Sequence, residues 1–301
     1  MISHPTAYVL LTLNMALWGS SLVVTRAVHE IVPPFALTFW RWVVAVLVLL
    51  PIVWRKLPGA MPLVRRTWRN LALLCGFMVI GATFSVVAVN YTTAINASLI
   101  NGSQPLATAL VAFLIMRERL TLGSGLGILA AFVGLLVMIS HGSPLLLLNM
   151  SVNVGDIVML IAVIAWALYS VELHRQPEHP SGDVLLFLIA CTGLITVLPL
   201  YIAETIFVRE FIPSRNGVAA IVYVSLVASL LAVYLWNIVI RSVGATHAAL
   251  FLNLIPVFGA VFAILFLGEH LYAFHVIGAA LVFLGILMAV RDRLTTAPDR
   301  L

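Results

Sequence analysis

The sequence predicts an all-α integral membrane protein in which ten transmembrane helices form two inverted five-helix repeats. Three observations support this fold class: the composition, the length of the apolar runs and the similarity between the two halves of the chain. Of the 301 residues, 63% are hydrophobic and only 9% are charged, and the mean hydropathy is +1.15. A soluble domain carries about 45–50% apolar and about 25% charged residues. The solvent for this chain is therefore the lipid bilayer.

Ten apolar stretches are long enough to cross the hydrocarbon core, which takes about 20 residues of α-helix. The connections between them are short and leave no room for a soluble domain. A β-barrel would alternate apolar and polar residues, which these runs do not do. We expect helices because backbone exposed to lipid must form hydrogen bonds within its own segment. In chain order, the predicted spans are 6–27, 33–54, 70–90, 92–115, 121–141, 153–173, 183–207, 217–240, 245–267 and 271–290.

The first span has the length of a secretory signal peptide, but it lacks the basic residues that precede the apolar core of such a peptide. Its first positive charge is Arg26, which follows the apolar run. We therefore expect this segment to be retained as a membrane span.

Basic residues are distributed unequally between the two sets of loops. If the N-terminus lies in the cytoplasm, twelve of the sixteen Lys and Arg residues fall in cytoplasmic loops or the C-terminal tail, and only Arg209 and Arg215 fall in loops on the other side. This asymmetry follows the positive-inside rule. Both termini are therefore expected in the cytoplasm, with the protein in the cytoplasmic (inner) cell membrane. The net charge of +5 reflects this distribution and not a nucleic-acid-binding surface.

The second half of the chain repeats the first. Residues 94–136 align without a gap on residues 245–287 at a constant shift of 151, with thirteen identities in 43 positions. The identities include a mid-span proline, a loop glutamate and two glycines, which shared apolar composition does not easily explain. We therefore divide the chain into two five-helix repeats, residues 1–150 and residues 151–301.

Each repeat contains five spans, an odd number, so the second repeat enters the membrane in the opposite orientation. In many transporters, inverted repeats place the substrate site near the midplane of the membrane, where the two halves meet. Polar and aromatic residues in the middle of the spans are therefore the candidates for a binding site.

Pro105 in the fourth span and Pro256 in the ninth occupy equivalent positions of the repeat. A proline inside a helix removes a backbone donor and clashes with the carbonyl four residues before it. The two prolines are either static kinks or hinges at which the helix halves bend. Asn101 and Asn253 lie in matching turns beside them, and polar side chains at this depth usually face the bundle interior. Both are candidates for lining a substrate cavity; the alternative is hydrogen bonding between helices.

Aromatic residues form the second group of candidates. Membrane tryptophans normally lie in interfacial belts, but Trp18 and Trp166 each lie about twelve or more residues into a span, and they align at a shift of 148. Together with Tyr169, they are candidates for a flat wall that contacts an apolar or aromatic substrate; the alternative is a lipid-facing position. Phe84 and Tyr234 are further candidates for the same wall.

Ionisable residues within the spans are few. Arg41 lies well inside the second span, so it should face protein or water and not lipid. We expect one of three roles for Arg41: a structural ion pair, capping of backbone carbonyl groups, or binding of a substrate carboxylate. A proton is the candidate coupling ion, although no acidic residue or histidine lies clearly at mid-span. The groups that could carry it are Asp156, Glu172, Glu204 and His247.

Two further features are duplicated in the repeats. Glu118 and Glu269 close the fourth and ninth spans, and we expect them to be solvated helix ends that cap the following helix through its dipole. Small residues on one face of the fifth and tenth spans allow close approach of helices. These are Gly123, Gly127, Gly134, Gly278 and Gly285.

Residues that the chain lacks exclude several other classes of protein. The only lysine, Lys56, lies in a predicted loop, which excludes a Walker A motif and a retinal Schiff base within a span. An aspartyl intramembrane protease needs two aspartates in spans, and only Asp156 is close to one; a zinc protease needs HExxH, which does not occur. We expect no catalytic residue, cofactor or metal site. A phosphorylated cargo would need several basic residues in the spans, so a neutral or zwitterionic cargo is favoured.

Several runs of sequence resemble the drug/metabolite transporter superfamily, EamA type. They are ALWGSSLVVTRAV in the first span, FWRW in the second and GD…WALYSVE in the sixth; the loops RERL and GEHL, each before a glycine-rich span, strengthen the match. The resemblance covers nearly the whole chain. It implies a ten-helix exporter of small metabolites, often amino acids, that works by alternating access, and aromatic amino acid exporters are among the members. A membrane-embedded enzyme and a transporter of other small drugs or metabolites remain open alternatives.

Overall fold

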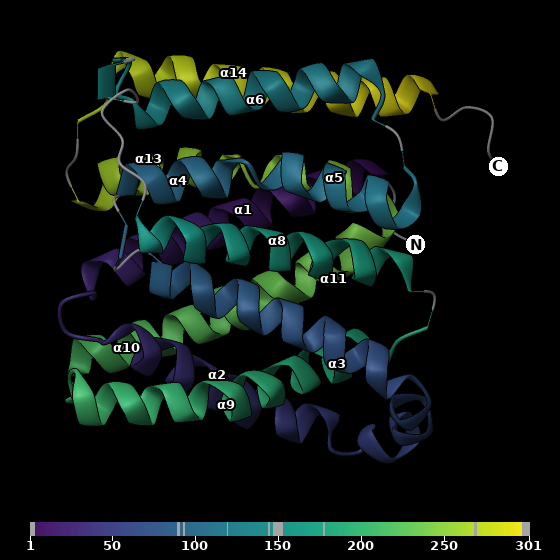
Figure 1. The fold of residues 1–301 in the computed structure, drawn as a ribbon, viewed down its shortest axis with the longest axis vertical. Coiled ribbons are helices and arrows are strands. Elements are labelled where there is room, and N and C mark those ends of the chain that lie inside the picture. The colour runs from purple at the N-terminus through teal and green to yellow at the C-terminus, as the bar shows by residue number, and fades with distance from the viewer. Residues whose placement is uncertain are drawn as a thin grey trace.

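The fold is a bundle of long helices that run side by side (Figure 1). The computed structural model describes residues 4–88, 91–92, 94–118, 120–143, 145–146, 153–176, 178–267 and 270–296. The first half contains α1 (His4–Ala27), α2 (Pro34–Val53), α3 (Leu57–Ala88), α4 (Ala94–Gly102), α5 (Gln104–Met116) and α6 (Leu122–Ile139). The second half contains α8 (Val154–Arg175), α9 (Gly182–Phe207), α10 (Arg215–Val224), the π-helix η1 (Ser225–Leu231), α11 (Ala232–Val243), α12 (Ala245–Phe251), α13 (Leu254–Leu267) and α14 (Ala273–Thr296).

These elements make ten passes through the bundle. In the described residues, nine helical segments are long and apolar enough to cross a membrane, and the tenth pass is the interrupted helix α4–α5, whose second piece is a shorter apolar helix. The elements α10, η1 and α11 form one pass, and α12 and α13 form another. The prediction of an all-helical membrane protein is confirmed. We call the end of the bundle at which α1 begins and α14 ends the terminal end (Figure 1).

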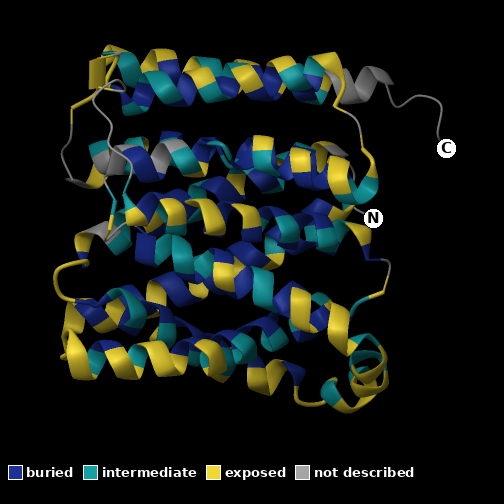
Figure 2. Ribbon diagram, in the orientation of Figure 1, coloured by how far each residue is buried: buried dark blue, intermediate teal, exposed yellow. Residues whose placement is uncertain are grey.

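Apolar side chains cover the outside of the bundle as well as its core. Leu47, Ile195 and Leu265 are each more than 60% exposed, and exposed residues line the outer helix faces while buried residues gather where helices meet (Figure 2). A soluble protein rarely exposes such contiguous apolar surface. In this fold the surface faces the acyl chains of the lipids.

Two passes differ in detail from the predicted spans. The third pass begins at Leu57 and not near residue 70, because an exposed, basic helical piece precedes a kink at Thr67 (φ −106°, ψ 15°). The eighth pass contains the π-helix Ser225–Leu231. The wider π-helical turn is a local change of backbone bonding, and it leaves no mark on the apolar pattern from which the span was predicted.

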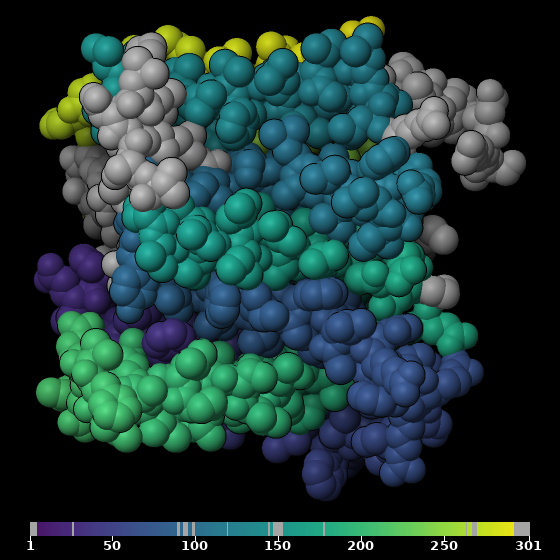
Figure 3. All heavy atoms as spheres, viewed as in Figure 1, coloured from purple at the N-terminus to yellow at the C-terminus, as the bar shows by residue number. Residues whose placement is uncertain are grey.

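The two halves pack around an approximate two-fold relationship. Helix α1 of the first half packs on α11 and α13 of the second half. Its counterpart in the second half, α8, packs on α3 and α5 of the first half. The remaining main pairs, α2 with α9 and α6 with α14, join equivalent helices. On the face shown in Figure 3, first-half helix α3 lies between α8 and α9 of the second half. The halves therefore interlock and do not form separate lobes.

The contact between α6 and α14 shows the same relationship at atomic scale. A Cβ atom on Gly127 would lie 2.5 Å from the carbonyl oxygen of Gly285, and one on Gly134 would lie 2.6 Å from that of Gly278. Gly127 is the repeat equivalent of Gly278, and Gly134 that of Gly285. The two-fold rotation therefore carries each contact onto the other, as a self-complementary two-fold interface requires.

Candidate functional site

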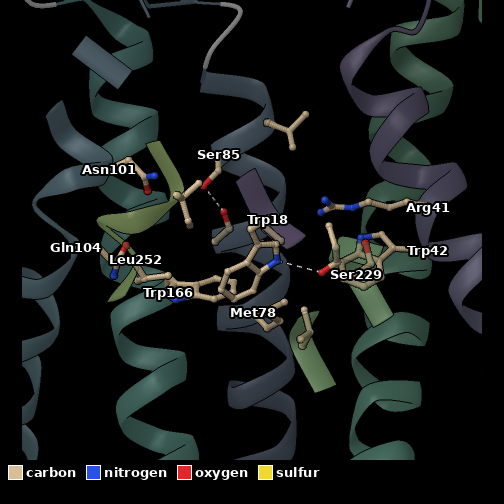
Figure 4. A pocket seen from close by; sticks show the side chains of 16 residues that line it. Trp18, Arg41, Trp42, Met78, Ser85, Asn101, Gln104, Trp166, Ser229 and Leu252 are labelled. Carbon is tan, nitrogen blue, oxygen red and sulfur yellow. Dashed lines mark hydrogen bonds between the residues drawn. The ribbon is translucent and has the colours of Figure 1, made fainter. Parts of the chain in front are cut away.

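A cavity of about 220 Å³ lies between the two halves in the middle of the bundle. Its walls come from α1, α2 and α3 of the first half, from α8, η1 and α11 of the second, and from both interrupted helices (Figure 4). None of the residues that line it is acidic, and Arg41 is the one cation among them. The lining residues discussed below are Trp18, Arg41, Trp42, Met78, Ser85, Asn101, Gln104, Trp166, Ala228, Ser229, Leu252 and Ile255.

Repeat-equivalent residues of both halves contribute to the lining of this cavity. Trp18 and Trp166 both line it, and so do the equivalent residues Asn101 and Leu252. Gln104 and its equivalent Ile255 form a third such pair. The cavity therefore lies on the approximate two-fold axis. Its chemistry is unequal, because the first half supplies amides where the second supplies aliphatic side chains.

The prolines lie just beyond interruptions of both helices. Helix α4 ends at Gly102 and α5 begins at Gln104; α12 ends at Phe251 and α13 begins at Leu254. At the second interruption, the backbone N–H groups of Leu252, Asn253 and Ile255 donate to carbonyls three residues before them, in place of the usual four. Pro105 and Pro256 each follow the interruption and prevent the regular ladder from continuing. The residues four before the prolines, Asn101 and Leu252, line the cavity.

Four aromatic rings pack together at the side of the cavity nearer the terminal end. We call Trp18, Trp166, Tyr169 and Trp236 the aromatic cluster. The ring centroids of Trp18 and Trp166 are 5.5 Å apart, and Trp236 lies 5.6 Å from Trp18 and 5.9 Å from Trp166. Tyr169 lies one turn beyond Trp166, its ring centroid 5.8 Å from that of Trp166. Because Tyr169 and Trp236 are fully buried, the cluster closes this side of the cavity.

The two equivalent tryptophans are held differently. The indole N–H of Trp18 donates to the carbonyl of Ala228, inside the π-helix, at 3.2 Å. The indole nitrogen of Trp166 is buried and has no hydrogen-bond partner in the described part of the chain. Trp166 instead packs closely against α3, where a Cβ atom on Gly81 would lie 3.2 Å from the Trp166 backbone nitrogen.

Arg41 extends into the cavity from α2, opposite Asn101 and Gln104 (Figure 4). Its side chain is 8% exposed, and among the described residues its Nε and Nη2 atoms have no hydrogen-bond partner. The guanidinium carbon lies 4.9 Å from the ring centroid of Trp42. A buried cation without an anion is costly, so this residue demands a functional explanation.

Asn101 and Gln104 form a polar wall of the cavity, and hydrogen bonds orient Gln104. Gln104 donates its side-chain N–H to the carbonyl of Val163 at 3.0 Å, so its side-chain oxygen is the group that can accept a bond within the cavity. Thr108 donates to the backbone carbonyl of Gln104 at 2.9 Å. Asn101 is exposed at the end of α4 and lines the same wall.

Of the residues singled out from the sequence, Trp18, Arg41, Asn101 and Trp166 line the cavity. The other candidates for the substrate site lie around it. Tyr169 is buried behind Trp166 and donates its hydroxyl to the Asn237 side chain. Asn253 is 2% exposed and lies beside Leu252 without lining the cavity. Phe84 packs in a cluster with Ala88, Ala97, Met159 and Ala162. Tyr234 is 40% exposed and packs against Gly182.

The candidate proton carriers lie away from this cavity. Asp156 accepts hydrogen bonds from Thr92, from Asn96 at 2.8 Å and from the backbone of Asn153 at 2.9 Å. Glu204 accepts from the backbone N–H groups of Phe35 at 3.2 Å and Ala36 at 2.8 Å, at the start of α2.

The remaining carriers lie at helix ends. Glu172 pairs with Arg175 at 2.9 Å. His247 lines a second cavity, of about 60 Å³, together with Glu118 at the terminal end of the bundle. Glu269 lies outside the described residues.

Sequence reasoning missed several lining residues. Gln104 adjoins Pro105 and could have been found as the polar residue of that turn. Trp42 follows Arg41 in the FWRW run and could have been found from that run, which is part of the family resemblance. Met78, Ser85 and Ser229 gave none, because an apolar or small residue on a membrane helix has the same pattern whether it faces lipid or a cavity.

The fold and the site together define a multi-pass membrane protein with inverted repeats and a central cavity, the arrangement of secondary transporters. The sequence matches the EamA-like transporter family over residues 5–140 and again over residues 153–291. The chain belongs to this family, which places it in the drug/metabolite transporter superfamily and makes it a transporter and not an enzyme.

Relatives of known name agree with this assignment. The chain is 31% identical over 205 residues, 67% of this chain and 66% of the relative, to "Uncharacterized transporter YyaM" of Bacillus subtilis. It is 24% identical over 295 residues, 94% of each chain, to a "Probable amino-acid metabolite efflux pump" of Escherichia coli. A crystal structure of a protein 18% identical in sequence superposes with a TM-score of 0.79 over 98% of this chain and 100% of that one, which supports the fold.

Proposed function

We propose that the protein exports small neutral or zwitterionic metabolites, foremost amino acids including aromatic ones, from the cytoplasm by alternating access. The observation that carries this proposal is the cavity at the helix interruptions, to which equivalent residues of both repeats contribute. A related protein, of Escherichia coli, has a name that says amino-acid metabolite efflux pump. In this proposal both termini lie in the cytoplasm, as the distribution of Lys and Arg favours.

The size and lining of the cavity favour a small cargo with an apolar body. Its volume of about 220 Å³ is below the roughly 300–1,000 Å³ of sites for drug-sized ligands. Trp18, Trp166 and Met78 offer apolar surface, while Asn101 and Gln104 offer hydrogen bonds. An amino acid or similar metabolite matches both properties better than a bulky drug does.

Access would alternate by bending of the two interrupted helices at residues 102–104 and 252–253. In the described conformation, the aromatic cluster closes the cavity at the terminal end, which is the cytoplasmic end in this proposal. Because Trp18 lies on α1 and Trp166 on α8, rocking of one repeat against the other, with this bending, would separate the two rings. The two-fold relationship allows the complementary closure on the other side, so that one site faces each compartment in turn. A proton remains the candidate coupling ion.

The test is transport by purified protein in proteoliposomes loaded with a mixture of the common amino acids. Mass spectrometry follows the loss of each compound, with and without a proton gradient. We expect efflux of a subset of them. If no amino acid or related metabolite moves under either condition, the proposal is wrong.

A pair of tryptophan variants separates the cavity from the protein as a whole. Ala82 lines the cavity, so Ala82→Trp should fill it and stop efflux. Ile195 is 72% exposed on the outer surface, so Ile195→Trp should transport like the wild type. Equal transport by both variants would show that the cargo does not pass through this cavity.

A further inference from the structure

Arg41 is a buried cation inside the cavity, and no anion of the described chain balances it. Its side chain is 8% exposed, and the Nε and Nη2 atoms have no hydrogen-bond partner among the described residues. The three ion pairs found in the described ranges join Lys56 to Asp183, Arg66 to Glu178 and Arg175 to Glu172. None of them includes Arg41.

A purely structural role for Arg41 would need a carboxylate or backbone carbonyls in contact with it. The carboxylate that serves α2 from the neighbouring helix is Glu204, and it is occupied by the backbone N–H groups of Phe35 and Ala36. The cavity lining contributes no acidic residue. The contact that Arg41 does make is with the face of Trp42, at 4.9 Å, which leaves the N–H groups of the guanidinium available.

Trp42 holds Arg41 in a fixed position. The Trp42 ring is 1% exposed and packs against the backbone of α9 so closely that a Cβ atom on Gly193 would lie 2.6 Å from it. The guanidinium on its face is therefore preorganised, and a planar guanidinium matches the geometry of a carboxylate.

We propose that Arg41 binds a carboxylate of the cargo, so that the cavity selects compounds with a carboxylate and rejects amines without one. This inference rests on the proposed function and names the substrate class of the same site. An amino acid would place its carboxylate on Arg41, its apolar part against Trp18 and Trp166, and its ammonium group near an amide oxygen. An amine that lacks the carboxylate would add a second positive charge to a cavity without an anion.

Two matched sets of compounds test this selection. The first is phenylalanine, hydrocinnamate and phenethylamine; the second is leucine, isocaproate and isoamylamine. In each set the members share one skeleton and differ in whether they carry a carboxylate, an ammonium group or both. Binding to the purified full-length protein is measured by thermal shift and by titration of tryptophan fluorescence. Efflux of the same compounds from proteoliposomes is measured in parallel.

We expect the amino acid and the carboxylate of at least one set to bind the wild type, and the amine of that set not to bind. Arg41→Gln should weaken this binding by about 10- to 100-fold, the range that corresponds to loss of a hydrogen-bonded charge. Arg41→Lys keeps the charge but loses the planar fork, and should give an intermediate affinity. Wild-type binding that ignores the carboxylate, or binding of a carboxylate by Arg41→Gln within twofold of wild type, would overturn the proposal.

The control is a second arginine that lies over a tryptophan. The guanidinium carbon of Arg69 is 5.5 Å from the ring centroid of Trp68, and Arg69 is exposed outside the cavity. Arg69→Gln should bind all six compounds like the wild type. Equal loss in both variants would assign the effect of Arg41→Gln to general destabilisation and contradict the proposal.

The two readouts distinguish failure of this inference from failure of the proposed function. Efflux that is equal for carboxylates and amines refutes the role of Arg41 and leaves export intact. Carboxylate binding that depends on Arg41, without efflux of any compound, supports the role of Arg41 and contradicts export.

Discussion

Trp18 and Trp166 meet edge to face in the middle of the bundle, with ring centroids 5.5 Å apart and ring planes inclined by 78°. They are equivalent residues of the two repeats, so this contact lies on the approximate two-fold axis. It also separates the cavity from the terminal end of the bundle. A movement of one repeat against the other must therefore change this contact.

Substitution of Trp166 tests whether the aromatic wall contacts cargo. Trp166→Ala removes a ring that lines the cavity, and aromatic contacts contribute about 0.5–1.5 kcal/mol beyond burial. We expect efflux of phenylalanine from proteoliposomes to fall about fivefold or more, and that of leucine to fall less. Trp68 is 58% exposed and does not line the cavity, so Trp68→Ala should behave as the wild type. Full transport of phenylalanine by Trp166→Ala would remove this residue from the site.

The unequal bonding of the two tryptophans predicts unequal costs of replacing them with phenylalanine. Trp18→Phe loses the part-buried hydrogen bond to the Ala228 carbonyl, at a cost of about 0.5–1.5 kcal/mol. Trp166→Phe removes a buried N–H group that has no partner in the described residues, so it should cost less than Trp18→Phe.

Chemical or thermal unfolding of the purified variants in detergent measures this difference. Both substitutions remove the same atoms from equivalent positions, so each serves as the control for the other. A larger loss of stability for Trp166→Phe than for Trp18→Phe would show that the Ala228 bond does not stabilise this conformation.

The fold could be predicted from the sequence because its causes are local and repeated. The length of the apolar runs set the ten passes, and Pro105 and Pro256 marked the two helices that are interrupted. The shift of 151 between the halves identified the repeats without a structure. These signals depend on helix length and backbone chemistry, which each segment carries by itself.

The cavity was predicted less completely, because it depends on which face each helix turns inward. In a soluble protein an apolar stripe marks the buried face, but lipid is as apolar as the interior of a bundle. Phe84 and Trp18 therefore had the same pattern, and only one of them lines the cavity. Two further features arise from packing between distant helices: the hydrogen bond from Trp18 to the π-helix, and the close contact of Trp42 with Gly193. The sequence carried no direct sign of either.

The glycine contact between α6 and α14 predicts position-specific intolerance to alanine. A Cβ atom on Gly127 would lie 2.5 Å from the backbone oxygen of Gly285, so Gly127→Ala must push the helices apart, at about 1–3 kcal/mol. Gly125 lies on the same helix and has nothing within 4 Å of a Cβ atom. Gly125→Ala should be neutral or stabilising, since alanine favours helix by about 1 kcal/mol. Similar melting temperatures for the two variants would contradict the close approach of these helices.

Asp156, at the start of α8, holds the connection between α3 and α4 through hydrogen bonds, and we expect its substitution to destabilise the protein. With Asn153 it forms a capping box at the start of α8, and its carboxylate also accepts bonds from Thr92 and Asn96. The anchor joins the interrupted helix of the first repeat to the first helix of the second. Asp156→Ala removes the three bonds that the carboxylate accepts, from Thr92, Asn96 and the backbone of Asn153, and leaves the buried Asn96 amide without this acceptor. We expect a loss of about 3 kcal/mol, because hydrogen bonds to a charged group contribute about 1.5–3 kcal/mol each and are not additive.

The measurement for Asp156 is the unfolding free energy of the purified variant, with Glu178→Ala as the control. Glu178 forms an ion pair with Arg66 in which both side chains are more than half exposed, and such pairs contribute about 0–1 kcal/mol. Asp156→Asn keeps one acceptor oxygen and should fall between Asp156→Ala and the wild type. If Asp156→Ala is no less stable than Glu178→Ala, the bonds to Thr92 and Asn96 do not anchor this connection, and α4 must be held by its packing against α8 and α6.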